Sequence, residues 1–372
     1  MRHLLLLAAP LLATPAAAAV DLNAMHGVWK GTIGRLPVHA CYDPGEFRNE
    51  GKYFYDRVLK TIPLIVDDEK AGDVTEGWPD TKGIARWTIT TTAANQIEGV
   101  WRGNGKTLPI RLTRLPYTPD KEIATACGSL AFAQPIIAAG KVVRAPARAQ
   151  GLTIEQWSLV HADSDSYEIR SFQLPGTDSA TAAINRRLRK PFDDAHEGWI
   201  WCVRFAGAWG GQFSETIAPT LATRRWLAVT KQHESSCGGA HPNNSNVPTL
   251  FDRRTGAVVN LMDWMLPSMV YRKKVDGFEE TLDSLTGALS KFVVSRHPRN
   301  ALDDRECAEV IQTADTWSLE LRRDGIAFTP DLPRVVMACG DELVVSFRDL
   351  QPFLNPIGKR EVAALQSELA RR

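Results

Sequence analysis

The sequence lacks an excess of charge of either sign. It contains 44 Lys and Arg residues against 43 Asp and Glu residues, a formal net charge of +1. Nucleic-acid binding normally requires a basic surface, so this balance argues against a nucleic-acid partner. The basic run at residues 186–190 is a local exception, and we interpret it as the solvated face of an amphipathic helix.

Several catalytic motifs are also missing. No Gly-x-Ser-x-Gly or His-Glu-x-x-His segment occurs, which removes the sequence signals of a nucleophile elbow and of a zincin metal site. Residues 103–107 read Gly-Asn-Gly-Lys-Thr, like the end of a phosphate-binding loop, but Val100 stands where that motif requires glycine. We therefore reject a nucleotide site and expect no cofactor.

A long hydrophobic run occurs only at the N-terminus. Arg2 and His3 precede an apolar stretch at residues 4–12, and small residues at 17–19 fit a signal-peptidase cleavage site. The run is too short to span a membrane comfortably. No cysteine stands at the predicted cleavage site, so the sequence does not predict a lipid anchor. We predict a signal peptide at residues 1–19, no membrane span after its removal, and a periplasmic or secreted location.

Cysteine is sparse, and all six residues follow the predicted signal peptide. An even number in an oxidising compartment favours disulfides, although six cysteines allow fifteen connectivities. Pairing neighbours in chain order keeps each bridge local. This hypothesis gives the bridges Cys41–Cys127, Cys202–Cys237 and Cys307–Cys339.

The N-terminal region, residues 20–115, is predicted to be a small antiparallel β barrel or sandwich. Short runs of alternating apolar residues are separated by turn signals such as Asn104-Gly105. Trp29 and Trp101 occupy matching places in a repeated Gly-Val-Trp segment, and we expect both to be core residues. Residues 116–152, rich in proline and alanine, are interpreted as a connector.

Residues 153–356 are predicted to form an α+β domain, with a meandering antiparallel sheet and helices packed on one side. The expected elements include a capped helix after Thr177, a strand at 199–206, a long helix at 277–295 and a strand at 333–338. A polar helix at 357–372 follows. The acidic residues after the first helix are assigned to a solvated loop; they are Asp193, Asp194 and Glu197.

The segment 233–246 concentrates unusual residues, because two of the eight histidines, one cysteine, two glycines, a proline and three asparagines lie within it. Glycine and proline predict a sharp turn between two strands. His233, Cys237 and His241 are spaced four apart and could hold zinc on a helix, but the glycines and Pro242 disfavour that helix. A cysteine nucleophile activated by His241 is a second possibility, which a disulfide at Cys237 would remove.

This turn also carries a resemblance. The runs that carry it are residues 237–243, 249–256, 261–265, 317–319, 325–328 and 347–354. Together they resemble the extracytoplasmic domain of RsiV-type anti-sigma factors, which also occurs beside peptidoglycan deacetylase domains. The resemblance covers roughly residues 153–355. Cys237 departs from the tyrosine or small residue usual before the glycine pair, and no transmembrane or sigma-binding segment is present, so anti-sigma activity is not carried over.

The resemblance implies a non-catalytic module of the cell envelope that recognises a lysozyme-like protein or peptidoglycan. The predicted binding residues are Gly238, Gly239, His241, Asn243 and Trp264, with no catalytic or metal residues. The alternative prediction is a cell-wall glycan or peptide hydrolase with zinc at His233 and His241. Glycine-rich turns are often purely architectural, and that interpretation also stays open.

Overall fold

The computed structural model describes residues 20–43, 50–66, 72–77, 84–119, 121, 123–162, 166–207, 210–238, 241–274, 281–297, 304–314 and 316–371. The chain forms two compact units. The first comprises Met1–Pro135 and Gly207–Gly210, and the second comprises Ile136–Ala206 and Gly211–Arg372. The predicted signal peptide and Gly239 lie outside the described residues.

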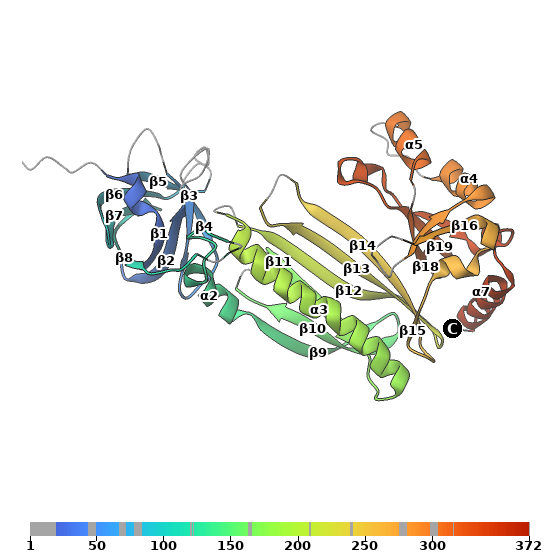
Figure 1. Cartoon of the computed structure of the whole chain (residues 1–372). Helices are drawn as coiled ribbons and strands as arrows, with labels where there is room; N and C mark the ends of the chain where they lie inside the picture. The colour runs from blue at the N-terminus through green and yellow to red at the C-terminus, as the bar shows by residue number, and fades with distance from the viewer. Residues whose placement is uncertain are drawn as a thin grey trace, which may run out of the picture. The chain divides into compact units, whose positions relative to one another are not determined.

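The first unit contains a closed antiparallel barrel in which each strand pairs with the next and β1 pairs with β8 (Figure 1). The strands are β1 (Gly27–Ile33), β2 (Leu36–Asp43), β3 (Glu50–Tyr55), β4 (Ile62–Val66), β5 (Asp73–Glu76), β6 (Arg86–Ala93), β7 (Gln96–Gly103) and β8 (Lys106–Leu115). The predicted β barrel is therefore confirmed. Four-residue β5 was not predicted, because Asp-Val-Thr-Glu is too short to show alternation.

Side chains fill the barrel interior, as expected for eight strands. Trp29 and Trp87 are fully buried there, whereas Trp101 is only partly buried at the edge of the same cluster. The carboxylate of Glu76 accepts hydrogen bonds from the indole N–H groups of Trp87 and Trp101 and from the Tyr53 hydroxyl, at 2.9, 2.7 and 2.7 Å. Trp29 is a core residue, as predicted. Trp101 is only partly buried, and its indole is held by the carboxylate of Glu76.

The outer surface of β2 and β3 is covered by the chain that follows residue 123. The predicted bridge Cys41–Cys127 is present, and Asp43 accepts hydrogen bonds from the backbone N–H groups of Ala126 and Cys127. Lys52 is 1% exposed beneath this covering segment, with its ammonium 5.6 Å from the centre of the Phe132 ring. Burial lowers the pKa of Lys52 to about 8, against the opposing attraction of nearby carboxylates.

We expect Lys52→Met to raise the free energy of unfolding by about 2 kcal/mol at pH 7, because the charged lysine is less well solvated folded than unfolded. Between about pH 8 and the unfolded value of 10.5, the unfolded chain binds a proton that the folded chain has lost. Stability of the natural protein therefore rises across this window, and the advantage of the variant disappears. Urea unfolding at pH 6 to 10 measures both effects. An equal gain from exposed Lys30→Met would contradict the explanation.

The second unit is built on a seven-stranded sheet of order β15-β14-β13-β12-β11-β10-β9. Its strands are β9 (Lys141–Ala149), β10 (Leu152–Val160), β11 (Tyr167–Gln173), β12 (Gln212–Ala222), β13 (Trp226–Ser236), β14 (Asn243–Asp252) and β15 (Ala257–Val259). The α+β class is confirmed. All neighbours are antiparallel except β11 and β12, which are parallel because a long helix crosses over between them. The predicted connector instead contains helix α2 (Leu130–Ala139) and edge strand β9.

Helix α3 (Ser179–Phe205) is that crossover, and it packs on the sheet (Figure 1). Asp178 caps its start by accepting a hydrogen bond from the Thr181 N–H at 2.9 Å. The predicted strand at 199–206 is wrong, because the buried stripe continues through Trp199 and Cys202 despite Pro191 within the helix.

The assignment of the acidic cluster to a loop is also corrected, because Asp193, Asp194 and Glu197 all lie within α3. Asp193 pairs with Arg189 and Asp194 pairs with Lys190, each four residues away and at the helix surface. Solvent screens such exposed pairs, so they contribute little to stability. Their arrangement indicates a solvated helix face, as expected for residues 186–190.

The remaining elements pack around a second hydrophobic cluster of this unit. In this unit they are η1 (Leu261–Trp264), η2 (Pro267–Met269), β16 (Val270–Lys274), β17 (Thr281–Leu285), α4 (Gly287–Arg296), α5 (Asp304–Gln312), β18 (Trp317–Leu321), β19 (Gly325–Pro330), η3 (Arg334–Cys339), β20 (Leu343–Ser346), α6 (Phe347–Leu350) and α7 (Pro356–Leu369). The short helix α1 (Leu22–Met25) belongs to the first unit. The predicted helix at 277–295 is confirmed in its second half as α4, whereas residues 281–285 form strand β17 instead, and residues 277–280 lie outside the described ranges. The predicted strand at 333–338 is the 3₁₀ helix η3, which the Cys307–Cys339 bridge ties to α5.

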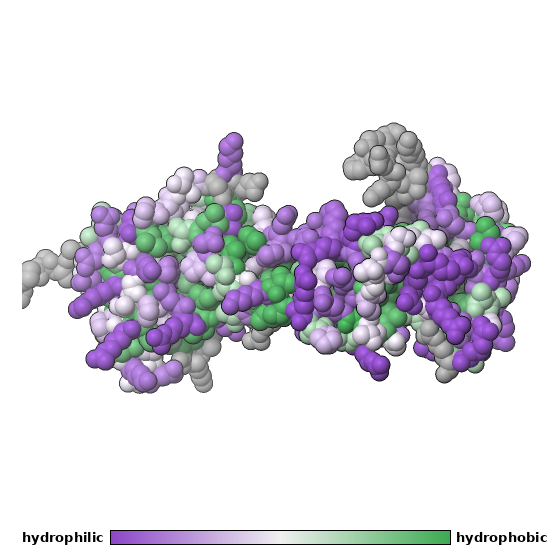
Figure 2. All heavy atoms as spheres, turned by 90° about the horizontal axis from the view of Figure 1, so that it is seen from below, coloured by the Kyte–Doolittle hydropathy of each residue, from purple (hydrophilic) through white to green (hydrophobic). Residues whose placement is uncertain are grey.

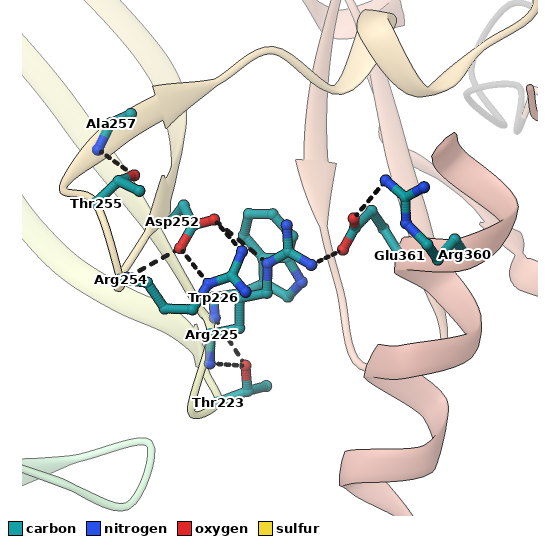
Figure 3. Close-up of polar contacts among 9 residues, drawn as sticks. All are labelled: Thr223, Arg225, Trp226, Asp252, Arg254, Thr255, Ala257, Arg360 and Glu361. Carbon is teal, nitrogen blue, oxygen red and sulfur yellow. Dashed lines mark hydrogen bonds and ion pairs between the residues drawn. The ribbon is translucent and has the colours of Figure 1, made fainter. Parts of the chain in front are cut away.

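The C-terminal helix α7, close to its predicted bounds, is joined to the sheet by buried charges (Figure 3). Arg225 donates to Asp252 at 3.3 Å and also to Glu361 on α7. The two carboxylate side chains are only 10% and 4% exposed. Burial opposes ionisation of Asp252, but hydrogen bonds from Arg254 and then Arg225 outweigh it and lower the pKa of that carboxyl. Arg225 is therefore a central cation between two buried anions.

Candidate functional site

The glycine-rich turn lies where β13 ends and β14 begins. Cys237 is bonded to Cys202 of α3, so the second predicted bridge is also present. Gly238 has a φ of +87°, and a Cβ there would lie 3.0 Å from the carbonyl oxygen of Phe205 at the end of α3. A glycine is therefore required at this position for both conformation and space. His241 is exposed, and Asn243 is the first residue of β14.

An open pocket of about 540 Å³ adjoins this turn. It lies where β11 and β12 begin, β13 ends and β14 begins. Its lining consists of Ser166, Tyr167, Glu168, Gln212, Phe213, Ser214, Glu234, Ser235, Ser236, Pro242, Asn243 and Asn244. The structure therefore brings one predicted binding residue, Asn243, to a pocket, and places Gly238 and His241 in the adjoining turn.

The strand register decides which side chains face the same way. Ser214 pairs with Glu234, and Glu234 pairs with Asn244, so these three side chains share one face of the sheet. Phe213, one residue away, faces α3, since a Cβ on Gly198 of that helix would lie 3.0 Å from its ring. The Ser214 face is therefore the one that α3 does not cover. Its hydroxyl, amide and carboxylate groups offer both donors and acceptors of hydrogen bonds.

Charge in this pocket is limited. The carboxylate of Glu168 is paired at 2.7 Å with Arg170, two residues along β11. Glu234 is exposed.

On the face of the molecule seen in Figure 2, hydrophilic residues predominate and hydrophobic residues lie between them in small groups. In the described part of the chain, no helix is long and apolar enough to cross a membrane.

Trp264 does not flank the turn, which corrects that prediction. It is 2% exposed on η1, and its ring centre lies 5.5 Å from that of Trp226. Trp226 begins β13, whereas the turn follows the last residue of that strand, roughly 30 Å further along. The sequence suggested that Trp264 lies near the glycine-rich turn because it follows a hairpin. In the structure, Trp264 and the turn lie near opposite ends of β13.

The two alternative chemistries proposed for the turn both lose Cys237. Cys237 is in a disulfide, so it cannot act as a thiolate nucleophile or zinc ligand. His233 lies on β13, where Nδ1 is 3.1 Å from Glu215 and Nε2 is 3.0 Å from the Ser235 hydroxyl. Among the described residues, no group of three or more His, Cys, Asp or Glu is arranged to hold a metal ion.

Glu215 and Ser235 were not singled out from the sequence. A signal for Ser235 was nevertheless present, because a strand continued to residue 236 places His233 and Ser235 on the same face. Glu215 could not be found this way, since its pairing with His233 depends on the register between β12 and β13.

Comparisons with known proteins identify structural neighbours from the DUF3298 family. A crystal structure of a DUF3298 family protein from Bacteroides fragilis NCTC 9343 covers 63% of this chain and 96% of its own, with 13% identity and a TM-score of 0.32. A DUF3298 family protein from Pseudomonas aeruginosa PAO1 covers 58% and 92%, with 11% identity and a TM-score of 0.32. No family model matches the chain, and no curated protein matches it.

Proposed function

We propose that this protein is a binding protein of the cell envelope, and that the pocket beside the glycine-rich turn binds the glycan of peptidoglycan. The observation that carries this proposal is the lining of the pocket. Ser214, Asn244 and Glu234 present hydroxyl, amide and carboxylate groups side by side on an uncovered sheet face. Sugars with hydroxyl and acetamido groups require mixed donors and acceptors of this kind.

The oxidising location supports an envelope ligand. Three disulfides join cysteines 32 to 86 residues apart, which is typical of proteins outside the reducing cytosol. A periplasmic or secreted location follows from the predicted signal peptide. The resemblance to RsiV-type extracytoplasmic domains, which also accompany peptidoglycan deacetylases, favours the same ligands.

A glycan fits this pocket better than a lysozyme-like protein does. Recognition of a basic protein would favour several free carboxylates, but Glu168 is already neutralised by Arg170. The pocket instead offers mainly uncharged polar groups. Lysozyme binding is therefore the competing outcome of the test rather than part of the proposal.

We expect the purified protein to co-sediment with peptidoglycan sacculi. The double variant Ser214→Ala/Asn244→Ala should bind the sacculi about tenfold more weakly, because two hydrogen bonds to the glycan are lost. His241→Ala tests the contribution of the exposed turn. Ser245→Ala, on the opposite face of β14, should bind like the natural protein. Immobilised lysozyme is the parallel ligand. Retention by lysozyme alone, or by neither ligand, would contradict the proposal.

A further inference from the structure

We propose that Ser235, His233 and Glu215 form an acyl-transfer site that hydrolyses small carboxylic esters. The geometry is that of a nucleophile, a base and a residue that orients the base. The Ser235 hydroxyl lies 3.0 Å from Nε2 of His233, and Nδ1 of the same ring lies 3.1 Å from Oε2 of Glu215. This activity goes beyond the proposed glycan binding: it uses Ser235, which also lines that pocket, rather than Ser214, Glu234 and Asn244.

Two features of the sheet bring the three groups together. Residues two apart on a strand point to the same face, which aligns His233 with Ser235 on β13. Glu215 on β12 is the direct cross-strand partner of His233. Each side chain therefore has its position fixed by a regular ladder rather than by a loop, as precise catalytic geometry requires.

The surroundings define the role of each group. Glu215 is only 8% exposed and also lies 4.0 Å from the ammonium of Lys231. A carboxylate only accepts hydrogen bonds, so we assign the proton of the neutral imidazole to Nδ1, which leaves Nε2 to accept from the Ser235 hydroxyl. The Phe213 ring packs edge-on against the imidazole, 5.1 Å between centres, and further fixes its orientation.

A donor for the developing oxyanion stands opposite the nucleophile. Asn243 is the cross-strand partner of Ser235 on β14, so both side chains lie on the same face. Side-chain amides of asparagine can stabilise a tetrahedral intermediate. On the other side, the Cys202–Cys237 bridge anchors the end of β13 two residues beyond Ser235.

The exposed position of the site favours esters in which a small acyl group is attached to a polar molecule. His233 and Ser235 are partly exposed, and Ser245 and Val247, which share their face on β14, are exposed. A substrate therefore reaches the hydroxyl from solvent, and the open pocket lined by Phe213, Ser235 and Asn243 offers space for a small acyl group. The groups proposed to hold a glycan, Glu234 and Asn244, point to the opposite face of the sheet, although Ser235 and Asn243 line the same pocket at the ends of the strands.

The reaction balances without a further reagent. The Ser235 oxygen attacks the ester carbonyl carbon as its proton passes to Nε2 of His233, and the carbonyl electron pair moves to oxygen. Collapse of this intermediate expels the alcohol, which takes the proton from His233, and leaves an acyl-serine. Water, deprotonated by His233, then releases the carboxylic acid and restores the serine.

The direct test is covalent labelling with a fluorophosphonate, located by peptide mass spectrometry, together with hydrolysis of p-nitrophenyl acetate. We expect stoichiometric labelling at Ser235 and an acetate burst. Ser235→Ala and His233→Ala should lower the rate at least a hundredfold. Ser245→Ala is the matched control, because it removes an exposed serine from the same face, and its rate should equal that of the natural protein. Melting temperatures verify that every variant is folded.

Glu215 is a positioning residue, so its test separates kcat from KM. Glu215→Gln should lower kcat at least tenfold with KM changed less than threefold, and Glu215→Asp should recover part of the loss. Labelling at another residue, an undiminished rate in Ser235→Ala, or no labelling and no hydrolysis by the natural protein would overturn the proposal. None of these outcomes depends on binding to sacculi, so this site and the glycan pocket fail or succeed separately.

Discussion

The double variant Cys202→Ala/Cys237→Ala is expected to lower the free energy of unfolding by about 4 kcal/mol. The bridge closes a loop of 35 residues, and the chain-entropy model assigns a loop of that length roughly this value. The bridge also joins the end of β13 to α3, immediately beyond Ser235. Its removal should therefore loosen the glycine-rich turn and slow fluorophosphonate labelling as well as reduce stability. Urea unfolding and the labelling rate measure the two effects.

The Cys307–Cys339 bridge supplies the control. It closes a loop of 32 residues in the same unit, so Cys307→Ala/Cys339→Ala should cost a similar amount of stability, also about 4 kcal/mol. This bridge ties α5 to η3, in the cluster that contains Trp226 at the start of β13, whereas Ser235 lies near the other end of that strand. Equal effects of the two double variants on labelling would show that the Cys202–Cys237 bridge has no particular role at the turn.

Replacing Arg225 by methionine is expected to lower the free energy of unfolding by about 3 kcal/mol, because two buried carboxylates lose their shared cation. Asp252 and Glu361 would remain without it, only 10% and 4% exposed, and α7 would lose its charged link to the sheet. The loss of the Arg225 guanidinium from the face of Trp226, 4.4 Å away, adds to the effect. Chemical denaturation at pH 7, with tryptophan fluorescence as the signal, measures it.

Arg254→Met is the matched comparison. Arg254 pairs with the same Asp252 at 3.0 Å, but its side chain is 60% exposed. Solvent screens such a pair, so we expect Arg254→Met to lower the free energy of unfolding far less than Arg225→Met does. The double variant Arg225→Met/Glu361→Met should be more stable than Arg225→Met alone, since it removes a buried carboxylate whose remaining partner is the exposed Arg360. A loss from Arg254→Met as large as that from Arg225→Met would contradict the assigned role of burial.

The barrel strands were largely predictable because their information is local. Trp87 and Ile89 alternate with polar residues on one strand, and Asn104-Gly105 predicts the hairpin between the next two. The disulfide pairing followed from chain order and is confirmed in full. Helix α3 was predicted only in part. Its last residues were assigned to a strand at 199–206, but the burial of Trp199 and Cys202 on the helix outweighs local propensity.

The candidate site depended more strongly on tertiary structure. The sequence located the glycine-rich turn and the histidines beside it, because residue types and their order along the chain are sufficient to predict a turn. It could not place Trp264, whose buried contact with Trp226 depends on how the C-terminal elements pack.

By itself, then, the sequence determined the fold class, the three bridges and the position of the turn, since alternation, turn chemistry and cysteine order are properties of the chain. Only the tertiary structure decided that Glu215 lies beside His233 and Ser235, and that Ser214, Glu234 and Asn244 share a face. The physical reason is strand register. A shift of one residue between β12 and β13 would place the β13 side chains on the opposite face from their present β12 partners without changing any local pattern.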